Sequence, residues 1–393
     1  SRGPGPRLYD RAPPYYFSVN EVGRRSSPNT QAMASGERSL LLPQVLRRHN
    51  DAGPQTLLQR VGPCLPLAVG VIIVSAALIN FNKYLIHKDR FPFPVALVMM
   101  HTGFSSLFCF LLLLARPSLF PSLTDPASKV DVGRAFVCKR ALPVALLFTG
   151  QLVLSNSAYT YASVAFLQML KESNVVLVYM LSVAFLLETF KLRSAAVLLM
   201  IVFATTLTIK GELHFSLTGF VIQGLSCLFE SSKILIQGAV LSGSENKLDA
   251  LSFVLTVSPL CFGLLVLLAG FHHAVLPIAF VHLPVWADLV NNRHLLALNV
   301  LVAFSLNVVI AFFMKHSSAI AFVIVGIVKD AMIVLASARI LRDPISNMQA
   351  CGFAMQLAFV ALWSLMKTFP ERFEAGIIPG VGAVLRGDLY KGR

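Results

Sequence analysis

The chain has 393 residues, of which 56% are hydrophobic and only 13% are charged, and its mean hydropathy is +0.71. A soluble domain of this size needs a far more polar surface, so the composition excludes that class and indicates a polytopic helical membrane protein. The formal net charge of +14 is explained by basic loops beside anionic lipid, so we expect a lipid bilayer and no nucleic acid as partner.

Residues 1–60 differ from the rest of the chain, because they are rich in Arg, Pro, Ser and Gly. They lack the apolar stretch of a secretory signal, and we expect a disordered basic tail in the cytosol. A plastid transit peptide is the alternative, since the segment is rich in Arg and poor in acidic residues. The chain begins at Ser1 and has a methionine at Met33, so the sequence leaves open whether Met33 is the true start and whether residues 1–32 are native.

Ten apolar runs follow this tail, and a membrane-spanning helix needs about 20 such residues. We expect helices at roughly 64–85, 93–115, 141–161, 163–187, 192–210, 216–242, 249–271, 295–314, 316–341 and 345–367. The connection at 282–295 is either a loop or an interfacial turn. The sequence therefore predicts a ten-helix membrane domain at 64–367, followed by a cytosolic C-terminal tail at 368–393.

The distribution of Lys and Arg predicts how these helices are oriented. An even number of helices places both termini on one side, and the loops on that side hold 23 of the 33 Lys and Arg residues. The loops on the other side hold seven, and three lysines fall inside helices. Because cytosolic loops are enriched in Lys and Arg, we expect both termini in the cytosol.

Six charged residues lie inside the expected helices: Lys171, Glu172, Glu230, Lys233, Lys329 and Asp330. A charge at the centre of a membrane helix costs about 2.5–3.5 kcal/mol on insertion scales, so each of them needs a partner. Lys329 and Asp330 are adjacent and point about 100° apart, so we expect each to find its partner elsewhere. Glu230 and Lys233 are three residues apart on one face and can pair directly.

Three short echoes indicate an internal repeat. KESNVVLV (171–178) resembles KDAMIVLA (329–336), NKYLI (82–86) resembles SKILI (232–236), and LSN (154–156) resembles SLN (305–307). Each pair is five helices apart, so we expect two repeats, at 64–210 and 216–367. Because five is odd, the second copy is inverted, as in many secondary transporters, whose sites lie between the two halves.

No pattern typical of catalysis or metal binding is present. The six cysteines show no metal-ligand spacing, and most lie in apolar runs where Cys packs as a small hydrophobic residue. The chain has no nucleophile elbow, metalloprotease motif or phosphate-binding P-loop. We therefore expect no enzyme, no cofactor and no metal site.

Two stretches carry a familiar set of residues. SNSAYTYASVAFLQMLKESN (155–174) contains Asn156, Tyr161, Phe166, Gln168 and Lys171, and residues 316–352 contain Ser318, Gly326, Lys329, Ser337, Ser346 and Gly352. In these positions the chain resembles the third-to-fourth-helix and ninth-to-tenth-helix signatures of the triose-phosphate and nucleotide-sugar transporters. This family belongs to the drug/metabolite transporter superfamily. Residues 215–237 resemble its sixth helix, and the resemblance covers about 64–367.

The resemblance implies ten helices in two inverted five-helix repeats. It also implies a secondary antiporter that exchanges a nucleotide sugar or sugar phosphate for a nucleoside monophosphate or phosphate by alternating access. Lys171 and Lys329 match the family's phosphate-binding lysines, and two ammonium groups from symmetric helices would clamp phosphate oxygens. Unpaired charges make an empty site costly, which favours exchange over the return of an empty carrier.

Several neutral residues are further candidates for the substrate site. Asn156, Tyr159 and Tyr161 would contact the sugar or the base, and Gln168 is a weaker candidate. The alternative for the tyrosines is an interfacial belt, and the alternative for Asn156 is hydrogen bonding between helices.

Two positions depart from the family's pattern. Plastid phosphate translocators carry two adjacent basic residues in the ninth helix, whereas the second of them is Asp330 here. The family's sixth helix often has Arg where this chain has Lys233. Both departures weaken a triose-phosphate substrate without naming another one, and we keep Lys233 and Asp330 among the expected substrate-binding residues.

The six charges also allow a reading without transport chemistry, in which they form a neutral network that only holds the bundle together. A plastid-type phosphate translocator and a drug or metabolite exporter of the same superfamily are the alternatives for function. We expect an organelle membrane, with the Golgi or endoplasmic reticulum ahead of the plastid envelope. Homodimerisation is left open.

Overall fold

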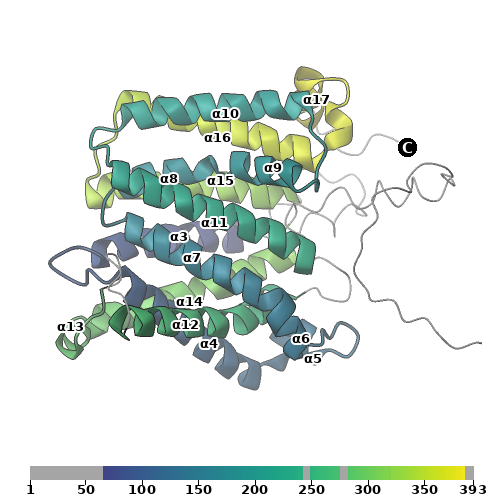
Figure 1. Ribbon diagram of the computed structural model, residues 1–393. Helices are drawn as coiled ribbons and strands as arrows, with labels where there is room; N and C mark the ends of the chain where they lie inside the picture. The colour runs from purple at the N-terminus through teal and green to yellow at the C-terminus, as the bar shows by residue number, and fades with distance from the viewer. Residues whose placement is uncertain (1–64, 242–247, 275–281, 318, 386–393) are drawn as a thin grey trace, which may run out of the picture. The chain divides into compact units, whose positions relative to one another are not determined.

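The computed structural model describes residues 65–385, except for residues 242–247, 275–281 and residue 318. Every regular element among the described residues is a helix (Figure 1), so the predicted all-α class is confirmed for this part of the chain. The tail predicted at residues 1–60 and the last eight residues of the chain lie outside the described part.

The helices begin and end close to the predicted boundaries. The longer ones are α3 (Leu65–Leu85), α4 (Pro94–Ala115), α7 (Leu142–Ala158), α8 (Val164–Glu172), α9 (Asn174–Ala184), α10 (Leu192–Gly211), α11 (Leu217–Leu241), α12 (Ala250–Ala274), α14 (Arg293–His316), α15 (Ala319–Ala336) and α16 (Asn347–Thr368). The shorter ones are η4 (Pro117–Leu119), α5 (Pro121–Thr124), α6 (Arg134–Phe136), η5 (Val137–Ala141), α13 (Trp286–Asn291), η6 (Ser337–Leu341), η7 (Pro370–Phe373) and α17 (Ile377–Leu385). The connection predicted as a loop or an interfacial turn thus contains the short helix α13.

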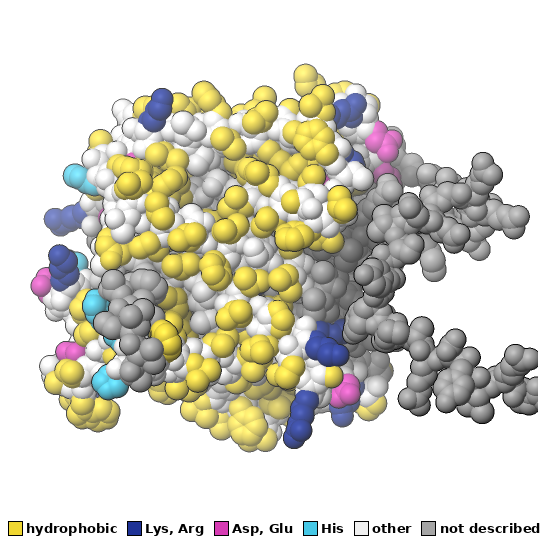
Figure 2. Space-filling view, in the orientation of Figure 1, with side chains coloured by type: hydrophobic (Ala, Val, Ile, Leu, Met, Phe, Trp, Pro, Cys, Tyr) yellow, Lys and Arg dark blue, Asp and Glu magenta, His cyan; other side chains and the backbone are white. Residues whose placement is uncertain are grey.

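Nine helices of the described residues are long and apolar enough to cross a membrane. Two of them are composite, because Arg134–Ala158 joins α6, η5 and α7, and Val164–Ala184 joins α8 and α9. They stand at nine of the ten predicted positions, and α15 stands at the remaining one, so a tenth span stays a prediction. In Figure 2 hydrophobic side chains cover the middle of the visible face and charged side chains gather at its two ends, as in a multi-pass membrane protein.

Local signals explain where several helices begin. The hydroxyl of Ser163 caps α8 by accepting a hydrogen bond from the N–H of Phe166 at 3.1 Å. Ser346 caps α16 in the same way, accepting from the N–H of Gln349 at 3.1 Å. Helix α4 begins at Pro94, where the missing N–H would have had no partner within the helix. These signals are short-range, so they could be read from the sequence.

The fourth predicted helix, at 163–187, is broken in the structure. Helix α8 ends at Glu172 and α9 begins at Asn174, and the hydroxyl of Ser173 donates to the carbonyl of Leu170 at 2.7 Å. A serine that bonds back to the preceding turn competes with the helical hydrogen bonds and bends the helix. The prediction of one continuous helix is therefore wrong at this point.

Helices from the first and second halves of the described chain alternate within the bundle. Helix α3 packs against α14 and α15, α11 packs against α7 and α9, α10 packs against α16, and α4 packs against α12. Figure 1 shows α10 and α16 side by side at the top of the view and α4 and α12 together near the bottom, with the other long helices between them. Each of these contacts joins one predicted repeat to the other.

Two glycines set the closest approach of α10 and α16. A Cβ atom at Gly211 would lie 2.5 Å from the backbone nitrogen of Gln349, and one at Gly352 would lie 2.7 Å from the backbone nitrogen of Thr208. A larger residue at either position would push the two backbones apart. The hydroxyl of Ser346 adds a hydrogen bond to the carbonyl of Gly211 at 2.6 Å. Small residues therefore act as packing positions in this pair, as is common between membrane helices.

The turn between α7 and α8 lies at the same end of the bundle as the end of α3 and the start of α16. The ammonium group of Lys83, in the last turn of α3, donates to the carbonyls of Tyr159 at 2.5 Å and Ala162 at 2.9 Å. The N–H of Val164 donates to Asp343, in the loop before α16, at 3.2 Å. The start of α3 and the end of α16 therefore lie at the opposite end.

Candidate functional site

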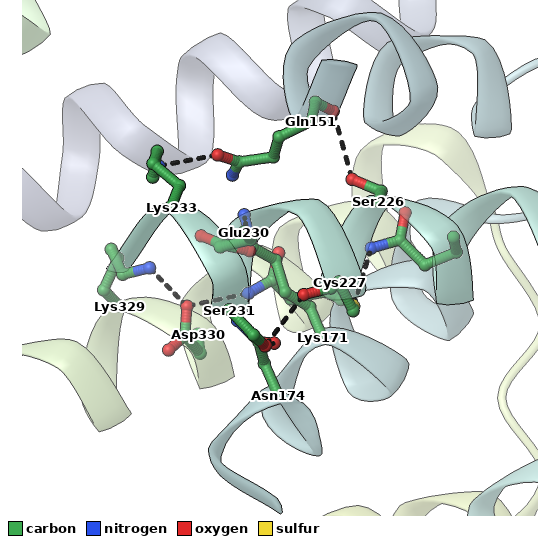
Figure 3. Close-up of polar contacts among 12 residues, drawn as sticks. Gln151, Lys171, Asn174, Ser226, Cys227, Glu230, Ser231, Lys233, Lys329 and Asp330 are labelled. Carbon is green, nitrogen blue, oxygen red and sulfur yellow. Dashed lines mark hydrogen bonds and ion pairs between the residues drawn. The ribbon is translucent and has the colours of Figure 1, made fainter. Parts of the chain in front are cut away.

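Six charged side chains from three elements lie close together inside the bundle, and we call them the charge cluster. They are Lys171 and Glu172 at the end of α8, Glu230 and Lys233 in α11, and Lys329 and Asp330 in α15. Figure 3 shows all of them except Glu172 gathered in one region. Lys171 interacts electrostatically with Asp330, and Glu230 interacts with Lys329, so the three helices contribute to a single cluster.

Helix α11 is held in place by hydrogen bonds to two neighbours on either side of the cluster. The hydroxyl of Ser226 donates to the backbone carbonyl of Gln151 on α7 at 3.1 Å. The hydroxyl of Ser231, which is fully buried, donates to the side-chain oxygen of Asn174 on α9. These contacts lie one turn before and one residue after Glu230, so they determine which way the charged face of α11 points (Figure 3).

Lys171 and Glu230 form an ion pair between α8 and α11. The Lys171 Nζ atom lies 3.5 Å from the Glu230 Oε2 atom, and the two side chains are 34% and 16% exposed. Among the described residues Oε2 has no hydrogen-bond partner, so the pair is held by charge attraction at the outer limit of hydrogen-bonding distance. A competing anion would therefore break few directed bonds when it takes the place of Glu230.

Lys329 and Asp330 pair with each other, contrary to the prediction. The Lys329 Nζ atom donates to the Asp330 Oδ1 atom at 2.5 Å. The prediction assumed that adjacent side chains on a helix diverge, but a lysine has a flexible four-carbon stem that can turn back on its neighbour. Gln168 on α8 donates to the same Oδ1 atom at 2.8 Å, and Asp330 is only 8% exposed. This carboxylate is thus held by its own helix and by a second one.

Lys233 is paired in a different way from the one predicted. Its ammonium group donates to the side-chain oxygen of Gln151 at 2.6 Å and lies 4.4 Å from the ring centre of Phe148. Glu230, which is placed on the same face and could have paired with it, forms its ion pair with Lys171 and interacts with Lys233 only electrostatically. Among the ion pairs of the described residues none includes Lys233, so its direct partners are a neutral amide and an aromatic ring.

Glu172 completes the charge cluster beside Asp330. Its carboxyl group lies within hydrogen-bonding reach of Asp330 and interacts with Lys329 and Lys171. Two carboxyl groups this close repel each other unless cations or a proton lie between them, and the two lysines supply positive charge. Three acids and three lysines cancel formally, so the arrangement also agrees with the neutral network considered above. The described residues contain no group of three or more His, Cys, Asp or Glu placed to hold a metal ion.

Asn156 lies in a separate chain of polar contacts between four helices. The Asn82 amide donates to the Asn156 side-chain oxygen at 3.3 Å, and the Asn299 amide donates to the Asn82 side-chain oxygen at 2.9 Å. The His101 Nε2 atom lies 2.5 Å from the Asn299 side-chain oxygen. The structure therefore shows the bonding between helices considered for Asn156, and a contact with substrate stays a prediction.

The two candidate tyrosines lie in different surroundings. The side chain of Tyr159 interacts electrostatically with Lys171, so it lies beside the charge cluster. Tyr161 is 44% exposed in the turn between α7 and α8. Gln168 bonds to Asp330 and belongs to the wall of the cluster. The structure thus brings Tyr159 and Gln168 to the cluster, whereas Tyr161 lies at the end of the bundle.

Sequence reasoning missed Gln151 and Lys83. Gln151 is 5% exposed and holds Lys233, and its signal was an amide in the middle of an apolar run. Lys83 was not among the candidate residues, and it lies in the last turn of α3 and binds backbone carbonyls in the turn between α7 and α8. The echo between NKYLI and SKILI aligns Lys83 with Lys233, so this signal was present in the repeat.

The chain is similar to known transport proteins over the region that contains the charge cluster. The model of the Triose-phosphate Transporter family matches residues 69–364. A probable sugar phosphate/phosphate translocator of Arabidopsis thaliana is 28% identical over 302 residues, which is 75% of this chain and 81% of the relative. A second one is 30% identical over 308 residues, 76% and 85% of the two chains. The GDP-mannose transporter GONST5 of the same plant is 27% identical over 304 residues, 77% and 85% of the two chains.

Proposed function

Because the chain belongs to the Triose-phosphate Transporter family, we propose that it exchanges a sugar phosphate or nucleotide sugar for inorganic phosphate or a nucleoside monophosphate. Membership makes the chain a transporter and not an enzyme, as the sequence predicted. The relatives are named for sugar phosphate, phosphate and GDP-mannose, which all carry phosphoryl oxygens. A phosphorylated anion is therefore the substrate chemistry that the proposal requires.

The observation that carries the proposal is the meeting of three ammonium groups inside an apolar bundle. Lys171, Lys233 and Lys329 come from three different helices, and Lys233 has no ion pair among the described residues. A cation whose direct partners are an amide and a ring is open to an anion, which would pair with it directly. Lys171 and Lys329 can then exchange their carboxylate partners for further phosphate oxygens.

Alternating access by two inverted five-helix repeats is part of the same proposal. If helices are numbered by their predicted repeat, α3, α4, α7, α8–α9 and α10 correspond to α11, α12, α14, α15 and α16. In this correspondence α7 matches α14 and α11 matches α3. The contact between α7 and α11 therefore has its counterpart in the contact between α14 and α3, and both contacts are present. The contact of α15 with α3 likewise corresponds to that of α9 with α11. These matching contacts support the inverted repeat and count α15 as the tenth span.

Asp330 favours a nucleotide sugar or a larger sugar phosphate over a triose phosphate. The resemblance implies a basic residue at this position in plastid-type translocators, and with Asp330 in its place this site would have one cation fewer and one anion more. Weaker attraction for a small, highly charged phosphate follows from that difference. A substrate with a larger neutral part can compensate through contacts with residues such as Tyr159, beside Lys171.

Exchange in reconstituted vesicles tests the proposal. We expect the purified full chain to take up labelled phosphate, glucose 6-phosphate or GDP-mannose into vesicles preloaded with phosphate or with a nucleoside monophosphate. The pattern of accepted pairs separates a sugar-phosphate exchanger from a nucleotide-sugar exchanger. The proposal is rejected if no pair of these compounds exchanges faster than it does in protein-free vesicles.

We also propose an organelle membrane, with the Golgi or endoplasmic reticulum preferred, and cytosolic termini. The orientation follows from the excess of Lys and Arg in the loops on the side of the termini. In sealed Golgi or endoplasmic-reticulum vesicles, protease added outside should remove a C-terminal tag. A tag that stays protected until detergent opens the vesicles would contradict this orientation.

A further inference from the structure

The charge cluster contains its own counter-ions for the two lysines that match the family's phosphate-binding positions. Glu230 lies 3.5 Å from Lys171, and Asp330 lies 2.5 Å from Lys329. Both carboxylates therefore occupy positions beside an ammonium group where a phosphate oxygen would otherwise bind. The side chains of Lys171 and Lys329 are 34% and 27% exposed, so neither pair is sealed off from an incoming anion.

These pairs change the energetic argument for obligatory exchange. The sequence argument held that an empty site is costly because its lysines are left unpaired inside the membrane. An unpaired buried cation is indeed costly, whereas a paired one is much less so. Because Glu230 and Asp330 neutralise Lys171 and Lys329 without any ligand, the empty site carries much less of that cost than a site with three unpaired lysines would.

We propose that Glu230 and Asp330 act as built-in substitutes for the substrate anion and allow the carrier to reorient while empty. The protein then carries out net transport of a phosphorylated anion down its gradient in addition to exchange. This inference rests on the proposed function and adds a second transport mode to it. When substrate arrives, its phosphate oxygens take over the lysines and the two carboxylates move aside.

The two carboxylates differ in how firmly they hold their lysines. Asp330 is hydrogen-bonded to Lys329, held in place by Gln168, and only 8% exposed. Glu230 lies at 3.5 Å from Lys171 with no hydrogen bond to the facing oxygen among the described residues. Asp330 is therefore the more effective substitute, and its loss should impair the empty carrier more than the loss of Glu230.

The experiment compares net uptake with exchange in the same vesicles. The full chain is reconstituted, the membrane potential is held near zero with potassium and valinomycin, and labelled inorganic phosphate is added outside. One set of vesicles is empty and the other is preloaded with unlabelled phosphate, and GDP-mannose replaces phosphate in a parallel pair. We expect uptake into empty vesicles within roughly tenfold of the exchange rate, because the empty site is internally neutralised.

Substitution of the two carboxylates tests whether they are needed for net uptake more than for exchange. Asp330→Asn should lower net uptake by at least about tenfold more than it lowers exchange, because Lys329 then loses the carboxylate that is hydrogen-bonded to it in the empty site. Glu230→Gln should have the same effect to a smaller degree. Asp131→Asn is the control variant and should change neither rate, because Asp131 is exposed and does not belong to the charge cluster. Equal losses of both rates in Asp330→Asn would overturn the inference, since Asp330 would then be needed for exchange itself.

The wild-type protein provides a second test that does not depend on any variant. Uptake that occurs only in preloaded vesicles overturns the inference and leaves the proposed exchange intact. Uptake in neither set, with either compound, overturns the proposed function and the inference with it. Uptake in both sets supports both.

Discussion

The Lys-acid pair at the end of α8 and the Lys-acid pair in α15 occupy matching positions in the predicted repeats, yet they are bonded differently. Lys171 reaches across to Glu230 on α11, whereas Lys329 bonds to Asp330 beside it. Helix α8 ends at Glu172, directly after its lysine, whereas α15 continues beyond Asp330 to Ala336. An ion pair between two helices depends on how those helices are placed, whereas a pair within one helix moves with that helix.

Equivalent positions in a repeat therefore need not have equivalent energetics. The pair of Lys171 and Glu230 changes whenever α8 and α11 shift against each other, as alternating access requires. The pair of Lys329 and Asp330 keeps its geometry during a rigid movement of α15, apart from the bond from Gln168. We therefore expect the ion pair between α8 and α11 to change with conformation. We expect α15 to keep its own counter-ion beside Lys329 in every orientation of the empty carrier.

The largest expected effect is the loss of exchange when either lysine is neutralised. Lys171→Gln and Lys329→Gln should each lower exchange by about 100-fold, the loss expected from removing a charge-assisted contact of nearly 3 kcal/mol. The protein should still insert, because the buried charge is removed. Exchange in vesicles is the measurement, and Lys315→Gln, exposed at the end of α14, is the matched control.

The double variant Lys329→Gln with Asp330→Asn decides between substrate binding and a purely structural network. Recovery of both stability and exchange in the double variant would favour the structural network. Exchange that stays lost in a stable double variant supports lysines that bind substrate. Wild-type exchange in either single variant would remove that lysine from the proposed site. The same comparison should include Glu172 and Glu230, which lie within the cluster.

The two ion pairs should also contribute differently to stability. Lys171→Gln strands Glu230, which has no other close ion pair among the described residues, and should cost about 3 kcal/mol of unfolding free energy. Lys329→Gln should cost only about 1 kcal/mol, because Gln168 still donates to Asp330. Thermal unfolding in detergent measures both, and Glu230→Gln should restore the stability of Lys171→Gln. Equal losses in the two single variants would contradict the bonding described here.

Lys233 should behave unlike either of the paired lysines. Its removal strands no carboxylate, so Lys233→Gln should change the free energy of unfolding by less than about 1 kcal/mol. Substrate affinity should fall, and the half-saturation concentration for exchange should rise by about tenfold, which is worth about 1.4 kcal/mol. A variant with unchanged half-saturation would show that Lys233 only fills the space beside Phe148.

The smallest expected effect concerns the bond from α8 to α15. Gln168→Leu removes one hydrogen bond to Asp330 and should cost about 1 kcal/mol of stability, seen as a modest fall in the midpoint of thermal unfolding. The same change in a Lys329→Gln background should cost more, because Asp330 then loses both of its donors. Additive losses in the double variant would mean that the two donors act independently.

Much of the fold could be predicted from the sequence, because membrane spans and helix caps are local signals. The apolar runs located the helices, and the capping residues Ser163 and Ser346 stand at two of their starts. The family and the transporter class were predicted from the residues around Lys171 and Lys329, and both are confirmed. The break at Ser173 was missed, since a serine inside an apolar run is compatible with a continuous helix as well.

The location of six charges inside apolar helices follows from the order of residues alone, because a charged residue within a membrane-length apolar run is recognised without any structure. How the six charges pair depends on the packing of the helices. The partner of a long, flexible side chain depends on which helices pack together and on how each is rotated, and neither property is encoded by spacing along one helix. For that reason Glu230 pairs with Lys171 on another helix, and not with Lys233 one turn away. Lys329, predicted to need a distant partner, is instead neutralised by its own neighbour.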